Sequence, residues 1–191
     1  MYKYFFFFLL EKMLIGSSLG RQLAPFVKGK KIIFKGKINV GYVTECLLGI
    51  QKVDKIIVVT GNDIFPSKMC MGHKCLELCN IDEVTRSFND LLDVLFQYTN
   101  EVRIVEPPPR CKRIEGHPNC TFWEDIVHED RFRVLISRIK TIRSRNNEIL
   151  GVVSNKYLMR AINGHTIWSL TGSDLTHFSK PALLQLSKLL G

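Results

Sequence analysis

The sequence lacks an apolar run long enough to cross a bilayer as a helix, which takes about 20 residues. Its N-terminus, MYKYFFFFLL, sets a lysine before a short apolar run and so imitates the start of a signal peptide. Cleavage near Gly16-Ser17-Ser18 would destroy a motif described below. We therefore expect residues 1–11 to be an apolar extension of a cytoplasmic protein without a transmembrane segment.

The sequence also lacks the paired C-x2-C spacing that makes a structural zinc site easy to identify. Zinc-ligand side chains occur in two looser groups: Cys70, Cys75 and Cys79 with His73, and Cys111 and Cys120 with His117. A chain of 191 residues can bury enough core to fold without a disulfide framework. We therefore expect reduced or locally bonded thiols, no metal and no cofactor.

Acidic residues are fewer than basic ones, with 18 Asp and Glu against 27 Lys and Arg, so the formal net charge is +9. Such a charge raises the local concentration of polyanions, including RNA and anionic lipids. Hydrophobic residues make up 46% of the chain, which excludes the composition typical of disorder. No internal repeat is present, and we expect a single domain over residues 12–191.

Basic residues gather in residues 131–145, where apolar side chains recur at helical spacing. The pattern predicts an amphipathic helix over 132–142 with the basic side chains on its outer face. These basic residues are Arg131, Arg133, Arg138, Lys140, Arg143 and Arg145. Such a face is either simply solvated or contacts the phosphates of RNA, and the sequence leaves both interpretations open.

Short β-branched runs alternate with helical patterns along the chain. Strands are predicted over 12–16, 31–34, 55–60, 101–105 and, more weakly marked, 151–153. Helices are predicted over 19–27, 42–50, 82–98 (with Asp82 as cap), 132–142 and 181–190. This alternation predicts an α/β protein, a three-layer α/β/α sandwich with a central parallel sheet.

Polar residues follow several of the predicted strands, at the sheet edge where such proteins bind ligands. Ser18 follows the first strand, where its hydroxyl can project from the edge or cap the next helix. Asn62, in Gly61-Asn62-Asp63, follows the third strand and can donate its amide to an oxyanion or serve in a turn. Gly41 precedes a helix and can supply a backbone N–H or a helix entry.

Asp174 lies three residues before His177, a spacing at which the two side chains can meet in a turn or short helix. The carboxylate would then fix the imidazole tautomer, which leaves the other ring nitrogen to take a proton from a serine. The alternative is structural, with Asp174 capping the last helix and His177 on its surface.

The order of these elements resembles the four sequence blocks of the SGNH (GDSL-type) hydrolases, from residue 12 to the end. The resemblance implies that Ser18 is the nucleophile and that Asp174 and His177 serve as acid and base. It also implies an oxyanion hole formed by the Ser18 N–H, Gly41 and Asn62. The implied activity is that of a serine esterase or deacetylase, acting without a cofactor on an ester-bearing substrate.

The first block departs from the usual Gly-Asp-Ser of the family, since Ser17 stands in the place of the acid. This departure and the net charge of +9 favour a second hypothesis, a catalytically inactive SGNH-like module that binds RNA. The C-terminal domain of the insect Oskar protein resembles such a module. The presence of serine, asparagine, aspartate and histidine at their expected places favours the enzyme.

Overall fold

The computed structural model describes residues 11–35, 39–59, 81–108, 123–144, 147–164, 167–173 and 177–190. Within these ranges the centre of the molecule is a five-stranded parallel sheet in the order β2-β1-β3-β4-β5. The strands are β1 (Lys12–Gly16), β2 (Lys30–Ile33), β3 (Lys55–Val59), β4 (Glu101–Val105) and β5 (Ile149–Val153). The chain steps outward from β1 to β2 and then returns to the other side of β1, so the order reverses between β1 and β3.

The central strands are mostly apolar after their charged first residues because both faces of the sheet are covered. In β1 and β3, four of the five residues are buried, whereas the edge strands β2 and β5 have no buried residue. The reversal between β1 and β3 is where open α/β sheets form a ligand crevice, beyond the carboxyl ends of the strands. The strand order therefore points to the residues that follow β1 and β3.

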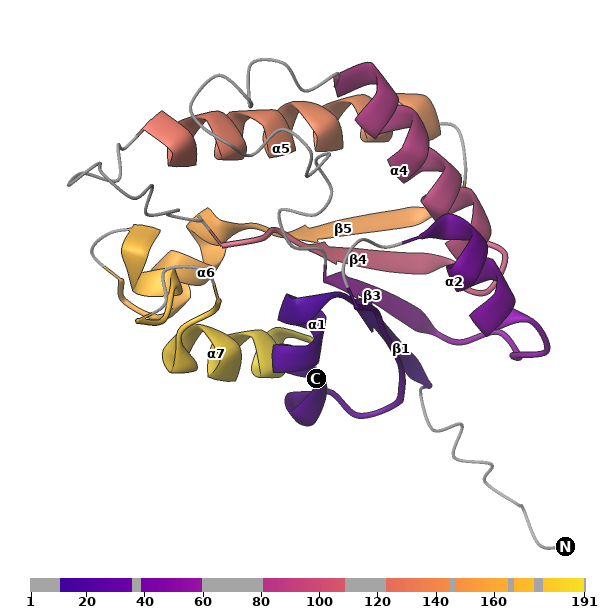
Figure 1. Ribbon diagram of the computed structural model, residues 1–191, viewed down its shortest axis with the longest axis horizontal. Coiled ribbons are helices and arrows are strands. Elements are labelled where there is room, and N and C mark those ends of the chain that lie inside the picture. Colours follow the sequence, from indigo (N-terminus) through magenta and orange to yellow (C-terminus); the bar gives the residue numbers. More distant parts are fainter. Residues whose placement is uncertain are drawn as a thin grey trace, which may run out of the picture.

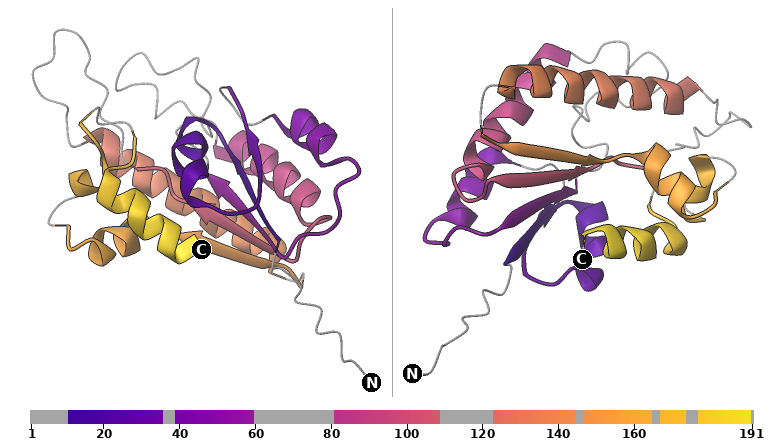
Figure 2. Two further views of the ribbon diagram at one scale, coloured as in Figure 1. Left: turned by 90° about the horizontal axis from the view of Figure 1, so that it is seen from below. Right: turned by 180° about the vertical axis from the view of Figure 1, so that it is seen from behind.

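Helices cover both faces of the sheet (Figures 1 and 2). On one face lie α2 (Val40–Leu47), α4 (Ile81–Leu95) and α5 (Trp123–Arg143). On the other lie α1 (Ser18–Leu23), with the 3-10 turn η1 (Ala24–Phe26), α6 (Asn155–Ala161) and α7 (Lys180–Leu190). Alternate residues of the strands supply the two cores: Met13 and Ile15 face the first set of helices, and Leu14 faces the second. The predicted three-layer fold is confirmed.

Several predicted boundaries need correction. The basic helix α5 begins at Trp123 instead of residue 132, and Asp82 is the second residue of α4 instead of its cap. Helix α6 was not predicted, because a helix of 7 residues shows too little periodicity. It begins after Ser154, whose hydroxyl accepts a hydrogen bond from the Tyr157 N–H at 3.2 Å. No helix in the described ranges combines the length and apolarity needed to span a membrane.

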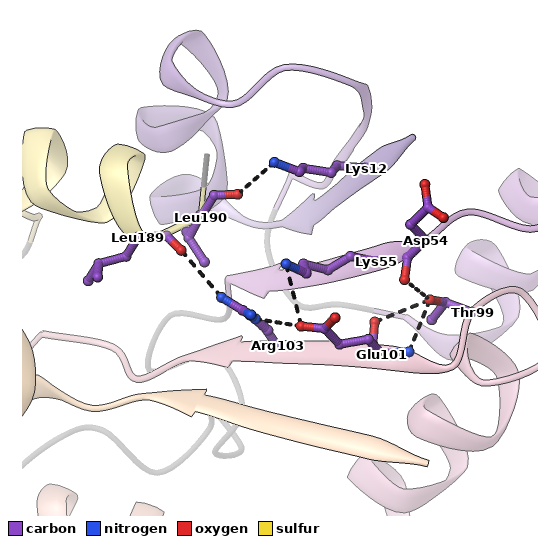
Figure 3. A network of polar contacts seen from close by, with 8 residues as sticks. All are labelled: Lys12, Asp54, Lys55, Thr99, Glu101, Arg103, Leu189 and Leu190. Carbon is purple, nitrogen blue, oxygen red and sulfur yellow. Dashed lines mark hydrogen bonds and ion pairs between the residues drawn. The ribbon is translucent and has the colours of Figure 1, made fainter. Parts of the chain in front are cut away.

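The amino-terminal end of the sheet is closed by charged side chains (Figure 3). The Glu101 carboxylate accepts a hydrogen bond from Arg103 at 2.6 Å and pairs with Lys55 at 3.4 Å. Arg103 and Lys12 each donate to one of the last carbonyls of α7, those of Leu189 and Leu190, at 3.3 Å. The last carbonyls of a helix lack partners within it, and cations there complement the helix dipole. These contacts fasten the end of α7 to the sheet.

Candidate active site

The turn between β1 and α1 is shaped by a glycine. A Cβ atom at Gly16 would lie 2.7 Å from the Gly20 Cα and 2.7 Å from the Val59 carbonyl oxygen, so no larger residue fits. The backbone N–H of Ser17 donates to that same Val59 carbonyl at 3.4 Å. The start of α1 is thereby held against the carboxyl end of β3, beside the reversal of strand order.

The two serines of this turn differ in exposure. Ser17 is 1% exposed, and its hydroxyl has no hydrogen-bond partner among the described residues. Ser18 is exposed as the first residue of α1. Ser17 occupies the cap position of α1 and forms no side-chain cap bond. Of the two serines, only Ser18 is accessible from outside the protein.

Gly41 is the second residue of α2, where backbone N–H groups have no partner within the helix. Asn39 caps this helix, and its side-chain oxygen accepts the Tyr42 N–H at 3.1 Å. A Cβ atom at Gly41 would approach that oxygen to 3.3 Å. The Asn39 side chain therefore satisfies one N–H donor of the first turn, that of Tyr42. The expected role of the Gly41 N–H in an oxyanion hole remains a prediction.

An aromatic pair connects α2 to the turn after β1. The Phe34 N–H donates to the Gly16 carbonyl at 2.8 Å, so the residue after β2 is bound next to the turn. The Phe34 and Tyr42 rings meet edge to face with centroids 5.3 Å apart. A hydrogen bond with Cys46 raises the pKa of the Tyr42 hydroxyl. The first turn of α2 thus lies at the same end of the sheet as Ser18.

His177 lies in a segment that returns antiparallel to residues 170–172. The Gly172 N–H donates to the His177 carbonyl at 2.8 Å, and the Ser179 N–H donates to the Leu170 carbonyl at 2.8 Å. Thr171 and Phe178 form a β-bridge between these two bonds. The backbone of His177 is fixed by these contacts and its side chain is half-buried.

The segment that carries His177 is bonded to the helix that begins with Ser18. Gln22, four residues after Ser18 in α1, donates to the Phe178 carbonyl at 2.8 Å and accepts the Phe178 N–H at 3.0 Å. The structure thus ties the neighbour of His177 to the helix that begins with Ser18. Asn62 and Asp174 lie outside the described residues, so the complete set stays a prediction.

Sequence reasoning missed two further groups at the carboxyl end of the sheet, the pair of Glu106 and Asn155 and the side chain of Gln22. Glu106 directly follows β4 and is buried, and its carboxylate accepts the Asn155 N–H at 2.6 Å. The Asn155 amide donates to the Pro107 carbonyl at 2.7 Å. A glutamate directly after an apolar strand was a usable signal for the first group. Gln22 gave no signal, because a polar residue in a short helix is commonly a solvated one.

The basic residues proposed for RNA contact do not form one face. Arg143 is 7% exposed, so the prediction that it lies on the outer face is wrong. Its guanidinium pairs with Asp93 at 2.7 Å and with Glu148 at 2.6 Å, and it lies over the Phe96 ring. Burial opposes the charge, but the hydrogen bonds that Arg143 donates to Glu148 and Asp93 outweigh it and raise the pKa of Arg143. This residue has a structural role.

The remaining members of the basic set are dispersed. Arg138 is bonded to the Asp82 carboxylate of α4, and Arg133 and Lys140 are exposed. Arg145 and the side chain of Arg131 lie outside the described residues. The two cysteine and histidine groups near residues 70–79 and 111–120 also lie outside them. Within the described ranges, no three His, Cys, Asp or Glu side chains gather as metal ligands would.

The fold can be compared with proteins of known structure. No protein-family model matches the sequence, and no curated protein matches it significantly. A GDSL-like lipase from Bacteroides thetaiotaomicron superposes with a TM-score of 0.58 at 10% identity, covering 95% of this chain and 85% of the lipase. An acetylxylan esterase from Geobacillus stearothermophilus gives 0.55 at 13% identity, with 93% and 91% covered.

A third similar structure is the lipase/acylhydrolase from Enterococcus faecalis, with a TM-score of 0.52 at 12% identity and coverage of 94% of this chain and 93% of that protein. At such low identity these likenesses establish the fold and leave the activity to be argued from the site. The chain has the three-layer α/β/α fold of the SGNH (GDSL-type) hydrolases.

Proposed function

We propose that the protein is a serine hydrolase of the esterase or deacetylase type, with Ser18 as nucleophile and His177 as general base. One observation carries the proposal: the exposed Ser18 begins a helix whose Gln22 is bonded to the residue next to His177. A nucleophile and its base must come within hydrogen-bond reach, so elements that present them have to be tied together. Asp174 is proposed to orient the imidazole.

The proposed reaction proceeds in two steps. His177 takes the proton of the Ser18 hydroxyl as its oxygen attacks the acyl carbonyl, and the resulting imidazolium then protonates the leaving alcohol. Water attacks the acyl-enzyme in the same way, which releases the acid and restores the serine. The Ser18 N–H, Gly41 N–H and Asn62 amide are proposed to bind the oxyanion of each tetrahedral intermediate.

The solved structures with this fold support ester chemistry as the first to test. They are a GDSL-like lipase, an acetylxylan esterase and a lipase/acylhydrolase. We therefore propose an ester-bearing substrate with a short acyl group. They lend no support to a relation with the Oskar domain.

The RNA-binding alternative is the weaker one. Arg143 is buried in ion pairs and Arg138 is bonded to Asp82, so two of its six proposed residues already have acidic partners. The exposed Lys140 and Arg133, together with the net charge of +9, are what still favour it. Binding that weakens steeply with added salt would be its signature, because each neutralised phosphate releases counterions.

The proposal is tested by hydrolysis of a short-chain aryl ester with Ser18→Ala and Ser17→Ala side by side. Loss of the nucleophile should lower kcat by roughly 1,000-fold or more. Ser17→Ala removes an equal hydroxyl from a buried site one residue away and should stay within about threefold of wild type. Stability should change little in Ser18→Ala, because its side chain is exposed. Equal activity of the two variants would reject the site.

A further inference from the structure

The side-chain amide of Gln22 pairs with both polar backbone groups of one residue, Phe178. Its nitrogen donates to the Phe178 carbonyl at 2.8 Å and its oxygen accepts the Phe178 N–H at 3.0 Å. A glutamine that uses both ends of its amide on one residue imitates a neighbouring β-strand. Gln22 is half-buried, and its two bonds join segments that are 156 residues apart in the sequence.

Phe178 is held on its other sides as well. Its ring is 2% exposed and belongs to the core cluster that includes Leu19 and Leu23 of α1. Its backbone forms the bridge to Thr171. Successive residues of an extended segment point to opposite sides. With Phe178 directed into the core, His177 is directed away from it.

The spacing along α1 fixes the distance between Ser18 and the contact made by Gln22. Ser18 and Gln22 lie on the same face of the helix because residues four apart are neighbours there. The helix therefore sets the distance between the Ser18 backbone and the point where Phe178 is bound. His177 precedes that point by one residue, so its backbone position relative to Ser18 depends on the Gln22 amide.

We infer that Gln22 is a positioning residue for His177, an inference that rests on the proposed function. It touches neither substrate nor reacting atoms. Its amide holds the peptide next to the general base, and a misplacement of a base by about 1 Å can cost roughly 100-fold in rate. In its absence, His177 and Ser179 would keep their bonds to Gly172 and Leu170, but Phe178 would lose its fixed distance to α1.

The test compares three variants by kcat and KM for the aryl ester. Gln22→Met keeps the length and helix propensity of the side chain but removes the amide, and it should lower kcat by roughly 10- to 100-fold with KM within about twofold. Gln22→Glu keeps an acceptor for the Phe178 N–H and loses the donor, so its kcat should fall between those of wild type and Gln22→Met.

The matched control is Thr99→Val at the opposite end of the sheet (Figure 3). The Thr99 hydroxyl also joins distant backbone, donating to the Asp54 carbonyl at 2.9 Å and accepting the Glu101 N–H at 3.1 Å. Thr99→Val should lower the melting temperature about as much as Gln22→Met and leave kcat unchanged. A wild-type kcat in Gln22→Met, or an equal loss of kcat in Thr99→Val, would overturn the inference.

A second readout does not depend on turnover. Amide exchange at Phe178 and the NMR line shape of the His177 ring should change in Gln22→Met and stay as in wild type in Thr99→Val. If the wild-type chain cleaves no ester, the proposed function fails, while these two signals still decide whether Gln22 fixes His177. Unchanged signals in Gln22→Met would contradict the positioning role whatever the activity.

Discussion

The two ends of the sheet differ in how their polar side chains are paired. At the amino-terminal end, charged and polar side chains find partners: Glu101 binds Lys55 and Arg103, and the last carbonyls of α7 are bound by Lys12 and Arg103 (Figure 3). At the carboxyl end, the hydroxyl of Ser17 is buried without a partner among the described residues. Unsatisfied buried groups and tight turns gather at functional sites.

Close backbone approaches that only glycine allows occur at both ends. At the carboxyl end, the turn after β1 brings Gly16 so close to Gly20 and to the Val59 carbonyl that no side chain fits. At the amino end, Gly29 has a φ of +118°, and a Cβ atom there would overlap the Lys12 carbonyl oxygen. The difference between the two ends therefore lies in how their polar side chains are paired.

The largest effect that would sharpen this contrast is expected at Asn62, at the carboxyl end. Asn62→Ala removes a proposed oxyanion donor and should lower kcat by about 100- to 1,000-fold, since one such donor lowers the activation barrier by about 3 kcal/mol. Because the lost hydrogen bond stabilises the transition state and not the bound substrate, KM should shift little. Steady-state kinetics on the aryl ester measure both. An unchanged kcat would remove Asn62 from the site.

The next effect concerns stability alone. Arg143→Met takes the guanidinium away from the half-buried Glu148 and leaves Asp93 with its bond from Asn89, and it should lower the free energy of unfolding by about 3 kcal/mol. Arg138→Met on the same helix breaks an exposed pair with Asp82 and should cost less than about 1 kcal/mol. Urea unfolding followed by circular dichroism compares them. Equal losses would contradict the account of Arg143 as a structural residue.

The smallest effect tests the amino-end network. Arg103→Met removes the bond to the Leu189 carbonyl and the pair with Glu101, and it should lower the free energy of unfolding by about 1 kcal/mol. Ester hydrolysis should stay at the wild-type rate, because this end of the sheet carries none of the proposed site. A large loss of activity in Arg103→Met would break the separation between the two ends.

The sequence predicted the sheet well because its signal is local. The run at 55–60 is β-branched and uninterrupted, and the run at 101–105 carries three β-branched residues; both form central strands within one residue of the prediction. Helix α6 escaped prediction because its 7 residues carry too little periodic signal. Asp82 was misplaced by a residue or two, as helix ends commonly are.

Predictions about side-chain partners were less successful because partners come from distant parts of the chain. Arg143 shares the helical pattern of its solvated neighbours, and only the packing of α4 against α5 buries it beside Asp93. Gln22 binds a peptide 156 residues away, a contact that no local pattern encodes. Ser18 could be proposed from the sequence because it follows a predicted strand, and the strand order places the position after β1 at the reversal of the sheet.

The most direct test of the central claim is labelling with a fluorophosphonate probe, followed by peptide mapping of the modified residue. The probe reacts with a serine only when a base has activated it, whatever the natural substrate. The account predicts one label on Ser18 in the wild-type chain, none in Ser18→Ala, and labelling preserved in Ser17→Ala. An unlabelled wild-type chain, or a label that persists in Ser18→Ala, would contradict it.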